Sequence, residues 1–130
     1  MTPHRFPITV FYEDTDMAGV VYYANYLKFI ERARSTIVEE IGVDQNAMRA
    51  RDLVFVITRV EADYLGAARL GDRLEVVTTH APTSPVRWVF DQEVQVAGRT
   101  IFRAHVIAAC MTTAGKPTRL PAEIRAIRTK

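Results

Sequence analysis

Hydrophobic positions in residues 22–41 recur at the spacing of an amphipathic helix. The steps between successive positions are 4, 3, 1, 3, 4 and 4 residues, which places them on one helix face. These positions are Tyr22, Tyr26, Phe29, Ile30, Ala33, Ile37 and Ile41. The opposite face is charged, and Gly42 stands where a glycine is favoured as a helix C-cap. The pattern predicts one long helix with a buried aromatic and aliphatic stripe.

The rest of the chain has the apolar alternation and the turn residues that are typical of β-strands. A short strand is expected before the helix at residues 6–12. The later strands are expected at residues 53–64, 73–80, 87–96 and 101–112. The unbroken apolar run at residues 53–57 predicts a strand buried on both faces. A short helix over residues 121–128 is expected to follow, with Pro121 near its start.

One long helix among five strands predicts an α+β fold, and 130 residues are enough for a single domain over residues 1–130. The antiparallel sheet is expected to cover the helix, because the aromatic stripe has no other partner. Such a sheet leaves edge strands exposed, and edge pairing between copies would cover them. We therefore expect a homo-oligomer, either a dimer or a tetramer.

Composition narrows the function classes. The net charge is only +2, and no run of like charges marks a surface for nucleic acid or for anionic membranes. No signal peptide or membrane-spanning stretch is visible in the sequence. The single cysteine, Cys110, excludes an internal disulfide and indicates a reducing compartment, so we expect a cytoplasmic protein.

Candidate chemistry concentrates where the first strand joins the helix. Asp16 precedes Gly19, and the turn leads to the helix start, where free backbone N–H groups and the positive end of the helix dipole gather. Such N–H groups can polarise a carbonyl as an oxyanion hole while a carboxylate, or the water it activates, attacks the carbon. Gly19 would allow the backbone to approach a substrate closely. On spacing alone, Asp16 fits a helix N-cap better than a catalytic residue.

The run Thr15-Asp16, Gly19, Val20-Val21, Tyr23 and Tyr26 resembles the signature of the 4-hydroxybenzoyl-CoA thioesterase family of hot-dog-fold proteins. The likeness extends over roughly residues 8–122 and is greatest to the YbgC-like, Tol–Pal-associated acyl-CoA thioesterases. It is carried further by Glu31-Arg32-Ala33-Arg34, Phe55-Val56-Ile57 and the run from Lys116 to Pro121. The resemblance implies a sheet wrapped around a central helix, with active sites at a subunit interface. It also implies hydrolysis of an acyl-CoA with no metal and no cofactor, coenzyme A being part of the substrate.

The resemblance also implies roles for particular residues. Asp16 corresponds to the catalytic aspartate, acting as nucleophile or as general base. The backbone N–H of Tyr23 would polarise the thioester carbonyl. Phe55, Val56 and Ile57 would line a short aliphatic or aromatic acyl group from the neighbouring subunit.

Two positions depart from the relatives. Tyr23 stands where members of the YbgC branch commonly carry histidine, and tyrosine here is closer to the hydroxybenzoyl-CoA enzymes. The loop at residues 82–85 often carries a basic residue near the CoA phosphates in relatives. Here Arg87 is the nearest one. Basic residues near the C-terminus offer a second way to contact the 3′-phosphate: Lys116, Arg119, Arg125, Arg128 and Lys130.

Several alternatives stay open. A hot-dog protein acting on acyl carrier protein would use the same cargo, and a non-enzymatic acyl-CoA-binding or scaffolding protein would use the same pocket. A dehydratase of this fold is disfavoured, because residues 13–42 contain no histidine. Asp14, the neighbouring carboxylate, is expected to be a solvated turn residue. The sequence contains no G-x-S-x-G elbow, no phosphate-binding glycine loop and no metal-ligand spacing.

Overall fold

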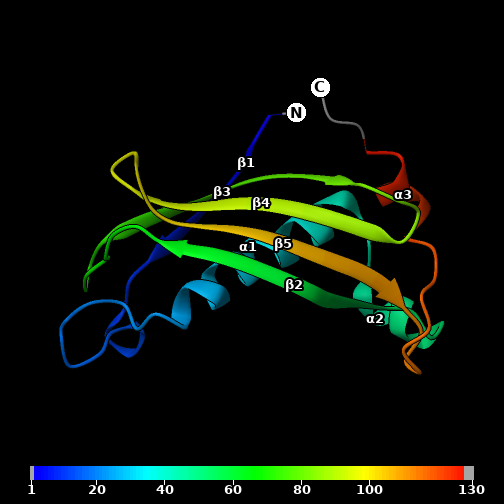
Figure 1. Cartoon of the computed structure of the whole chain (residues 1–130), viewed down its shortest axis with the longest axis horizontal. Helices are drawn as coiled ribbons and strands as arrows, with labels where there is room; N and C mark the ends of the chain where they lie inside the picture. The colour runs from blue at the N-terminus through cyan, green and yellow to red at the C-terminus, as the bar shows by residue number, and fades with distance from the viewer. Residues whose placement is uncertain (1, 128–130) are drawn as a thin grey trace.

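Five antiparallel strands form one sheet, and helix α1 (Asn25–Ile41) lies against one of its faces (Figure 1). The computed structural model describes residues 2–127. The order across the sheet is β1-β3-β4-β5-β2. The strands are β1 (His4–Thr9), β2 (Val54–Tyr64), β3 (Arg73–Pro82), β4 (Arg87–Val96) and β5 (Arg99–Met111). The expected α+β architecture, a sheet around one long helix, is confirmed.

Helix α1 buries the stripe that its sequence predicts. Tyr26, Phe29, Ile30, Ala33 and Ile37 are all buried, and they share the core with Trp88, Phe90 and Phe102 from β4 and β5. The helix ends as expected at Gly42, whose left-handed backbone (φ 97°) only glycine adopts without strain. It begins at Asn25 rather than near Tyr22, and the Tyr22 N–H donates instead to the carbonyl of Asp14 in the preceding loop.

Strand β2 corrects one expectation. It lies at the edge of the sheet beside β5, so its apolar start is not buried on both faces: Val56 is 38% and Ile57 43% exposed. Residues 2–127 provide no strand beyond it and no layer over its outer face. An apolar run of this length is compatible with a central strand and also with an edge strand whose apolar side chains are exposed in the single chain.

A β-bulge interrupts β2 at Thr58. Ile57 pairs with Ala108 and Arg59 with Ile107, so Thr58 is the extra residue. The Thr58 hydroxyl donates to the Ile107 carbonyl at 3.3 Å. The inserted residue breaks the alternation of side chains between the two faces of the sheet at this point.

Two short α-helices, α2 and α3, follow the long helix and the last strand, and a 3-10 helix, η1 (Tyr12–Asp14), follows β1. Helix α2 (Gln45–Ala50) was not expected from the sequence, although Asp44 carries its signal: this side chain caps the helix by accepting from the N–H groups of Asn46 and Ala47. Helix α3 (Ala122–Arg125) is the expected C-terminal helix, in shorter form. The last residue of that expectation, residue 128, lies outside the described residues.

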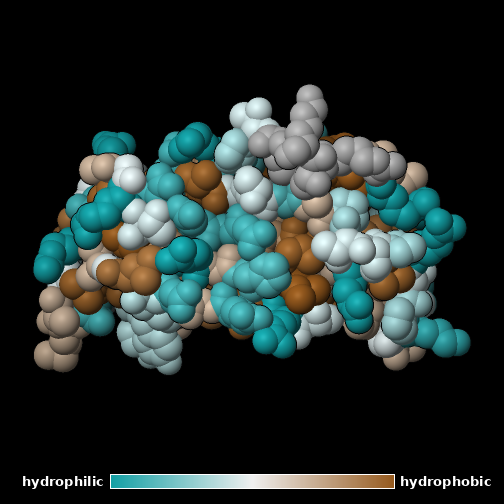
Figure 2. All heavy atoms as spheres, turned by 45° about the horizontal axis from the view of Figure 1, so that its top comes forward, coloured by the Kyte–Doolittle hydropathy of each residue, from teal (hydrophilic) through white to brown (hydrophobic). Residues whose placement is uncertain are grey.

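The face of the sheet away from α1 is polar. On this side an ion pair joins Arg5 to Glu75, and a hydrogen bond links Nδ1 of His105 to Asp91, each at 2.7 Å. Figure 2 shows hydrophilic side chains over much of the visible face, with smaller apolar patches between them. The apolar interior therefore lies between the sheet and α1.

A polar cluster is buried beneath α1. The side-chain amide of Gln92 donates to the Ile30 carbonyl at 3.0 Å and to the Thr78 hydroxyl at 3.1 Å, and its oxygen accepts from Arg34 at 2.9 Å. Burial lowers the pKa of the Arg34 guanidinium. Because buried polar groups are costly without partners, Gln92 holds the helix, β3 and β4 in one arrangement.

Replacing Gln92 by leucine is expected to lower the free energy of unfolding by about 1–3 kcal/mol, because the buried Thr78 and the half-buried Arg34 lose their partner. Urea unfolding followed by circular dichroism measures the change. Gln95→Leu on the same strand is the matched control: Gln95 bonds Glu93 outside the core and should cost less than about 1 kcal/mol. Equal losses in the two variants would contradict a structural role for the buried cluster.

Candidate active site

A tight loop between the 3-10 helix η1 (Tyr12–Asp14) and helix α1 carries the predicted site residues Asp16 and Gly19. Thr15 and Val21 form an isolated antiparallel bridge, and the Asp16 N–H donates to the Val20 carbonyl at 2.9 Å. Gly19 turns the chain with a φ of +78°, which explains the glycine by backbone conformation. A Cβ at this position would meet no atom within 4 Å, so lack of space is not the reason.

The Asp16 side chain is exposed and held by its own loop. Its Oδ1 accepts from the Ala18 N–H at 2.9 Å, while its Oδ2 has no hydrogen-bond partner in residues 2–127. Asp16 does not cap α1, whose N-cap is Ala24 with no side-chain cap bond. The capping role favoured by spacing alone is therefore wrong, and a carboxylate oxygen is left available for chemistry.

Asp14 is the structural acid of the pair, and it is not solvated as expected. It is only 7% exposed, and its Oδ2 accepts from the Phe11 N–H at 2.9 Å. Its carbonyl accepts from the Tyr22 N–H at 2.9 Å and from the Asn25 amide at 3.0 Å. Asp14 thereby ties the loop to the first residues of the helix. Together with the Asp16–Val20 bond, this brings the Asp16 segment alongside Tyr22 and the residue after it.

Tyr23 presents a backbone N–H at the start of α1 that has no acceptor among residues 2–127. Its side chain is 61% exposed. The Tyr23 carbonyl accepts from the Tyr64 hydroxyl at 3.0 Å, which fixes this turn of backbone from strand β2. Burial, followed by the neighbouring Tyr23, raises the pKa of Tyr64, so its hydroxyl keeps its proton and donates. Tyr64 escaped the sequence analysis, since a partner 41 residues away leaves no local signal.

Aromatic rings support this end of the helix. Tyr64 contacts Tyr23 edge-on at 6.1 Å and Phe102 at 5.0 Å between ring centroids. Tyr26 stacks on Phe102 at 5.1 Å and is buried, which confirms the expectation that it belongs to the core. The Tyr26 hydroxyl also accepts from the Ala68 N–H at 3.1 Å. The rings hold the backbone around Tyr23 in place without closing it off from solvent.

A cavity of about 160 Å³ lies between α1 and the other half of β2. Phe55 and Ile57 line it, with Trp88, Phe90 and Ala108 from the neighbouring strands. Glu31, Arg34 and Ser35 of α1 form a polar wall. Val56 does not line the cavity, because side chains alternate along the strand and Val56 points to the outer face of the sheet.

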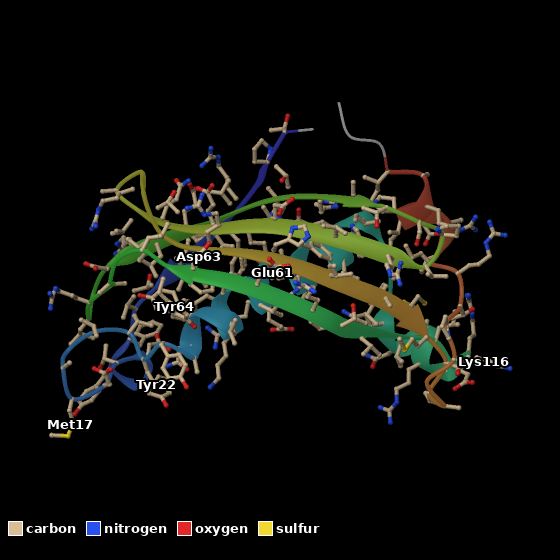
Figure 3. The ribbon with its side chains drawn as sticks, in the orientation of Figure 1. Met17, Tyr22, Glu61, Asp63, Tyr64 and Lys116 are labelled. Carbon is tan, nitrogen blue, oxygen red and sulfur yellow. The ribbon has the colours of Figure 1, made fainter. Side chains whose placement is uncertain are left out.

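A single chain does not bring these two groups of predicted site residues together. Ile57 and Tyr64 are separated by roughly 20 Å of strand, at about 3.3 Å per residue. Figure 3 shows Met17, the neighbour of Asp16, at one end of the molecule and Lys116 at the other, with Tyr22 and Tyr64 at the Met17 end. Asp16 and the Tyr23 N–H thus share one end, and the cavity lined by Phe55 and Ile57 lies toward the opposite end.

The loop between β3 and β4 meets the C-terminal arginines at this opposite end. A depression of about 480 Å³ is lined by Thr83 and Ser84 together with Arg119 and Arg125. Arg125 also donates from Nε to the Leu120 carbonyl at 2.8 Å. Lys116 does not line this depression, and Arg128 and Lys130 lie outside the described residues.

Other chemistries find little support in residues 2–127. No group of three or more His, Cys, Asp or Glu side chains could hold a metal ion in this part of the chain. Cys110 is buried, and burial raises the pKa of its thiol, which disfavours a thiolate nucleophile. None of the described helices is both long and apolar enough to cross a membrane.

Comparisons with known proteins agree with this geometry. Residues 10–127 match the thioesterase-like superfamily. The acyl-CoA thioester hydrolase YbgC of Escherichia coli O6:H1 is 37% identical over 125 residues, covering 95% of this chain and 93% of that protein. The acyl-CoA thioesterase YbgC of Haemophilus influenzae is 36% identical over 123 residues, covering 93% of this chain and 90% of that protein.

A solved structure supports the same family assignment. A 1,4-dihydroxy-2-naphthoyl-CoA thioesterase from Synechocystis matches with a TM-score of 0.87 at 25% identity, covering 93% of this chain and 91% of that one. The sheet and its central helix are therefore those of a known group of proteins, and the chain belongs to the thioesterase-like superfamily with its hot-dog fold.

Proposed function

We propose that this protein hydrolyses acyl-CoA thioesters to a free acid and coenzyme A. The observation that carries the proposal is the pairing of an exposed Asp16 carboxylate with the unbonded N–H of Tyr23 at the start of α1. The YbgC relatives, which carry this activity in their names, support the same reaction. The alternatives of an acyl carrier protein substrate and of a non-enzymatic binding protein have no comparable support.

The chemistry follows from two groups. The Tyr23 N–H donates to the thioester oxygen and stabilises the negative charge that develops on it. The free Oδ2 of Asp16 either attacks the carbonyl carbon or takes a proton from a water that attacks it. The carbon–sulfur bond then breaks and coenzyme A leaves as the thiol. No cofactor or metal enters this scheme, and coenzyme A is part of the substrate.

We propose further that the active site is completed by a second copy of the chain. Asp16 and Tyr23 are exposed in the protomer, whereas electrostatic catalysis is most effective where water is excluded. The apolar cavity bounded by Phe55 and Ile57 lies too far along β2 to serve the same protomer's Asp16. A homodimer, alone or within a tetramer, would set the cavity of one copy beside Asp16 of the other.

The same arrangement suggests where the coenzyme A part of the substrate binds. Arg119 and Arg125, beside Thr83 and Ser84, offer positive charge and hydroxyl groups for its phosphates. The depression lies at the cavity's end of the protomer, so one substrate molecule would span both subunits. We place the enzyme in a reducing cytoplasm, a proposal that rests on the single cysteine of the sequence.

The cavity limits the acyl group. A closed apolar cavity of about 150 Å³ is known to hold benzene. The half-open cavity of about 160 Å³ beside Phe55 and Ile57 is of similar size, so we expect it to suit a short aliphatic or a single-ring aromatic group. Thiol release from acetyl-, butyryl-, hexanoyl-, benzoyl-, 4-hydroxybenzoyl- and palmitoyl-CoA measures the preference. Butyryl to benzoyl esters should have the highest kcat/KM, and palmitoyl-CoA should fall at least about tenfold below them, because the cavity cannot enclose its chain. A preference for palmitoyl-CoA would show that the acyl group binds elsewhere.

Asp16→Asn is expected to lower kcat on the best of these esters by about 10²-fold or more, because the amide neither attacks nor accepts a proton. Thiol release with purified protein measures the effect. Glu13→Gln, an exposed acid three residues away, is the matched control and should stay close to wild type. An Asp16→Asn enzyme that keeps most of its activity would exclude this mechanism. No release from any CoA ester, but release from an acyl carrier protein ester, would move the activity to that carrier.

Tyr64→Phe tests the support of the oxyanion donor. Removing the hydroxyl frees the Tyr23 carbonyl, and kcat should fall about 3–10-fold with little change in KM, because small misplacements are costly in the transition state. Tyr22→Phe removes a neighbouring exposed hydroxyl, for which residues 2–127 offer no hydrogen-bond partner, and should leave kcat unchanged. Urea unfolding of both variants separates positioning from stability: a loss of kcat that merely follows a loss of folding would refute the positioning role.

A further inference from the structure

Arg34 of α1 is the basic side chain that lines the cavity beside Phe55 and Ile57. The residue is half-buried. Its Nη1 donates to the Gln92 side-chain oxygen at 2.9 Å, and the Arg34 side chain makes no second hydrogen bond within residues 2–127. Its Nε and Nη2 have no partner in this part of the chain, yet neither nitrogen is sealed from solvent. The guanidinium is therefore held at one corner and keeps open donors beside the cavity.

The charge of Arg34 is not neutralised by the described part of the chain. The ion pairs within residues 2–127 join other residues, so no carboxylate oxygen there lies within 4 Å of this guanidinium. Glu31, one turn earlier on α1, is exposed, and its Oε1 accepts from the Ser35 hydroxyl at 2.7 Å. Arginine keeps its proton in proteins, and a charge withdrawn from water is costly without a partner. The cavity therefore has a place for an anion.

A carboxylate is the anion that fits this place. Its two oxygens match the planar guanidinium fork, whereas a hydroxyl group would leave the charge uncompensated. The opposite wall is apolar, with Phe55, Ile57 and Trp88, so the rest of the ligand must be hydrocarbon. A volume of about 160 Å³ has room for only a few carbon atoms, since benzene needs a cavity of about 150 Å³. These features together describe a short hydrocarbon chain that ends in a carboxylate.

We propose that Arg34 is a specificity-determining residue that selects acyl groups ending in a carboxylate. The preferred substrates are then CoA monothioesters of short dicarboxylic acids, with four to six carbon atoms in the acyl group. This inference rests on the proposed function, because it names the acyl group of the same reaction. The thioester would lie at Asp16 and Tyr23 of one copy, and the terminal carboxylate would meet Arg34 in the cavity of the other.

Matched pairs of esters test the selection. Succinyl-, glutaryl- and adipyl-CoA differ from butyryl-, pentanoyl- and hexanoyl-CoA only by a carboxylate in place of the terminal methyl group. In at least one pair, kcat/KM should favour the carboxylate by about tenfold or more, because hydrogen bonds to charged groups are strong. Arg34→Met should abolish this preference. The ratio within one protein preparation does not depend on the fraction that is folded, so a merely structural role of Arg34 would not change it.

Arg32→Met is the matched control. Arg32 is an exposed arginine of the same helix, its guanidinium lies 6.0 Å from the centre of the Phe29 ring, and it does not line the cavity. This variant should keep the preference of the wild type. A wild-type enzyme with no preference in any of the three pairs, or a preference that persists in Arg34→Met, would overturn the proposal.

Binding of thioether analogues separates this inference from the proposed reaction, because thioethers are not hydrolysed. For the five-carbon pair, S-(4-carboxybutyl)-CoA should bind about tenfold or more tightly than S-pentyl-CoA in calorimetry, and Arg34→Met should bind both equally. Glu31→Gln should tighten binding of the carboxylate analogue by about two- to fivefold, since it removes a like charge from the cavity wall. Equal binding of the two analogues by the wild type would refute the role of Arg34 even if esters are hydrolysed. Selective binding without thiol release from any ester would refute the reaction and leave this role supported.

Discussion

The structure depends on the packing of one helix, α1, against one face of the sheet. Helix α1 and the inward side chains of the strands bury each other from Tyr26 onward, with Gln92 as the polar link between helix and sheet. The residues just before Tyr26 extend past this contact. They are held instead by backbone bonds to Asp14 and by the hydroxyl of Tyr64. The helix start is therefore both fixed in position and open to a substrate.

The sequence carries much of this arrangement because its periodicity reflects burial. The apolar stripe predicts α1 and its end at Gly42, and alternation predicts all five strands to within a few residues. The prediction that the run around Phe55 is buried on both faces was wrong, because an apolar run has the same sequence pattern in an exposed edge strand as in a central strand. Helix α2 is only six residues long, too short for periodicity to reveal it.

The residues of the candidate site that lie close together in the sequence could be predicted, and the residue that reaches the site from a distant segment could not. Asp16, Gly19 and Tyr23 lie within eight residues, so one local motif records them. Tyr64 acts through a contact between distant segments, and nothing near it in the sequence points to Tyr23. Asp14 and Asp16 look alike in the sequence, and only the fold separates the buried tie from the exposed acid.

The extra residue in β2 has a geometric consequence. Ile57 and Tyr64 are seven positions apart, an odd number that would turn them to opposite faces of a regular strand. Insertion of Thr58 changes the parity, so that both point toward α1. Deleting Thr58 would reverse Phe55 and Ile57 toward the outside and leave the space beneath the helix without its wall. One strand can therefore furnish two separate surfaces because it contains one residue more than its ladder needs.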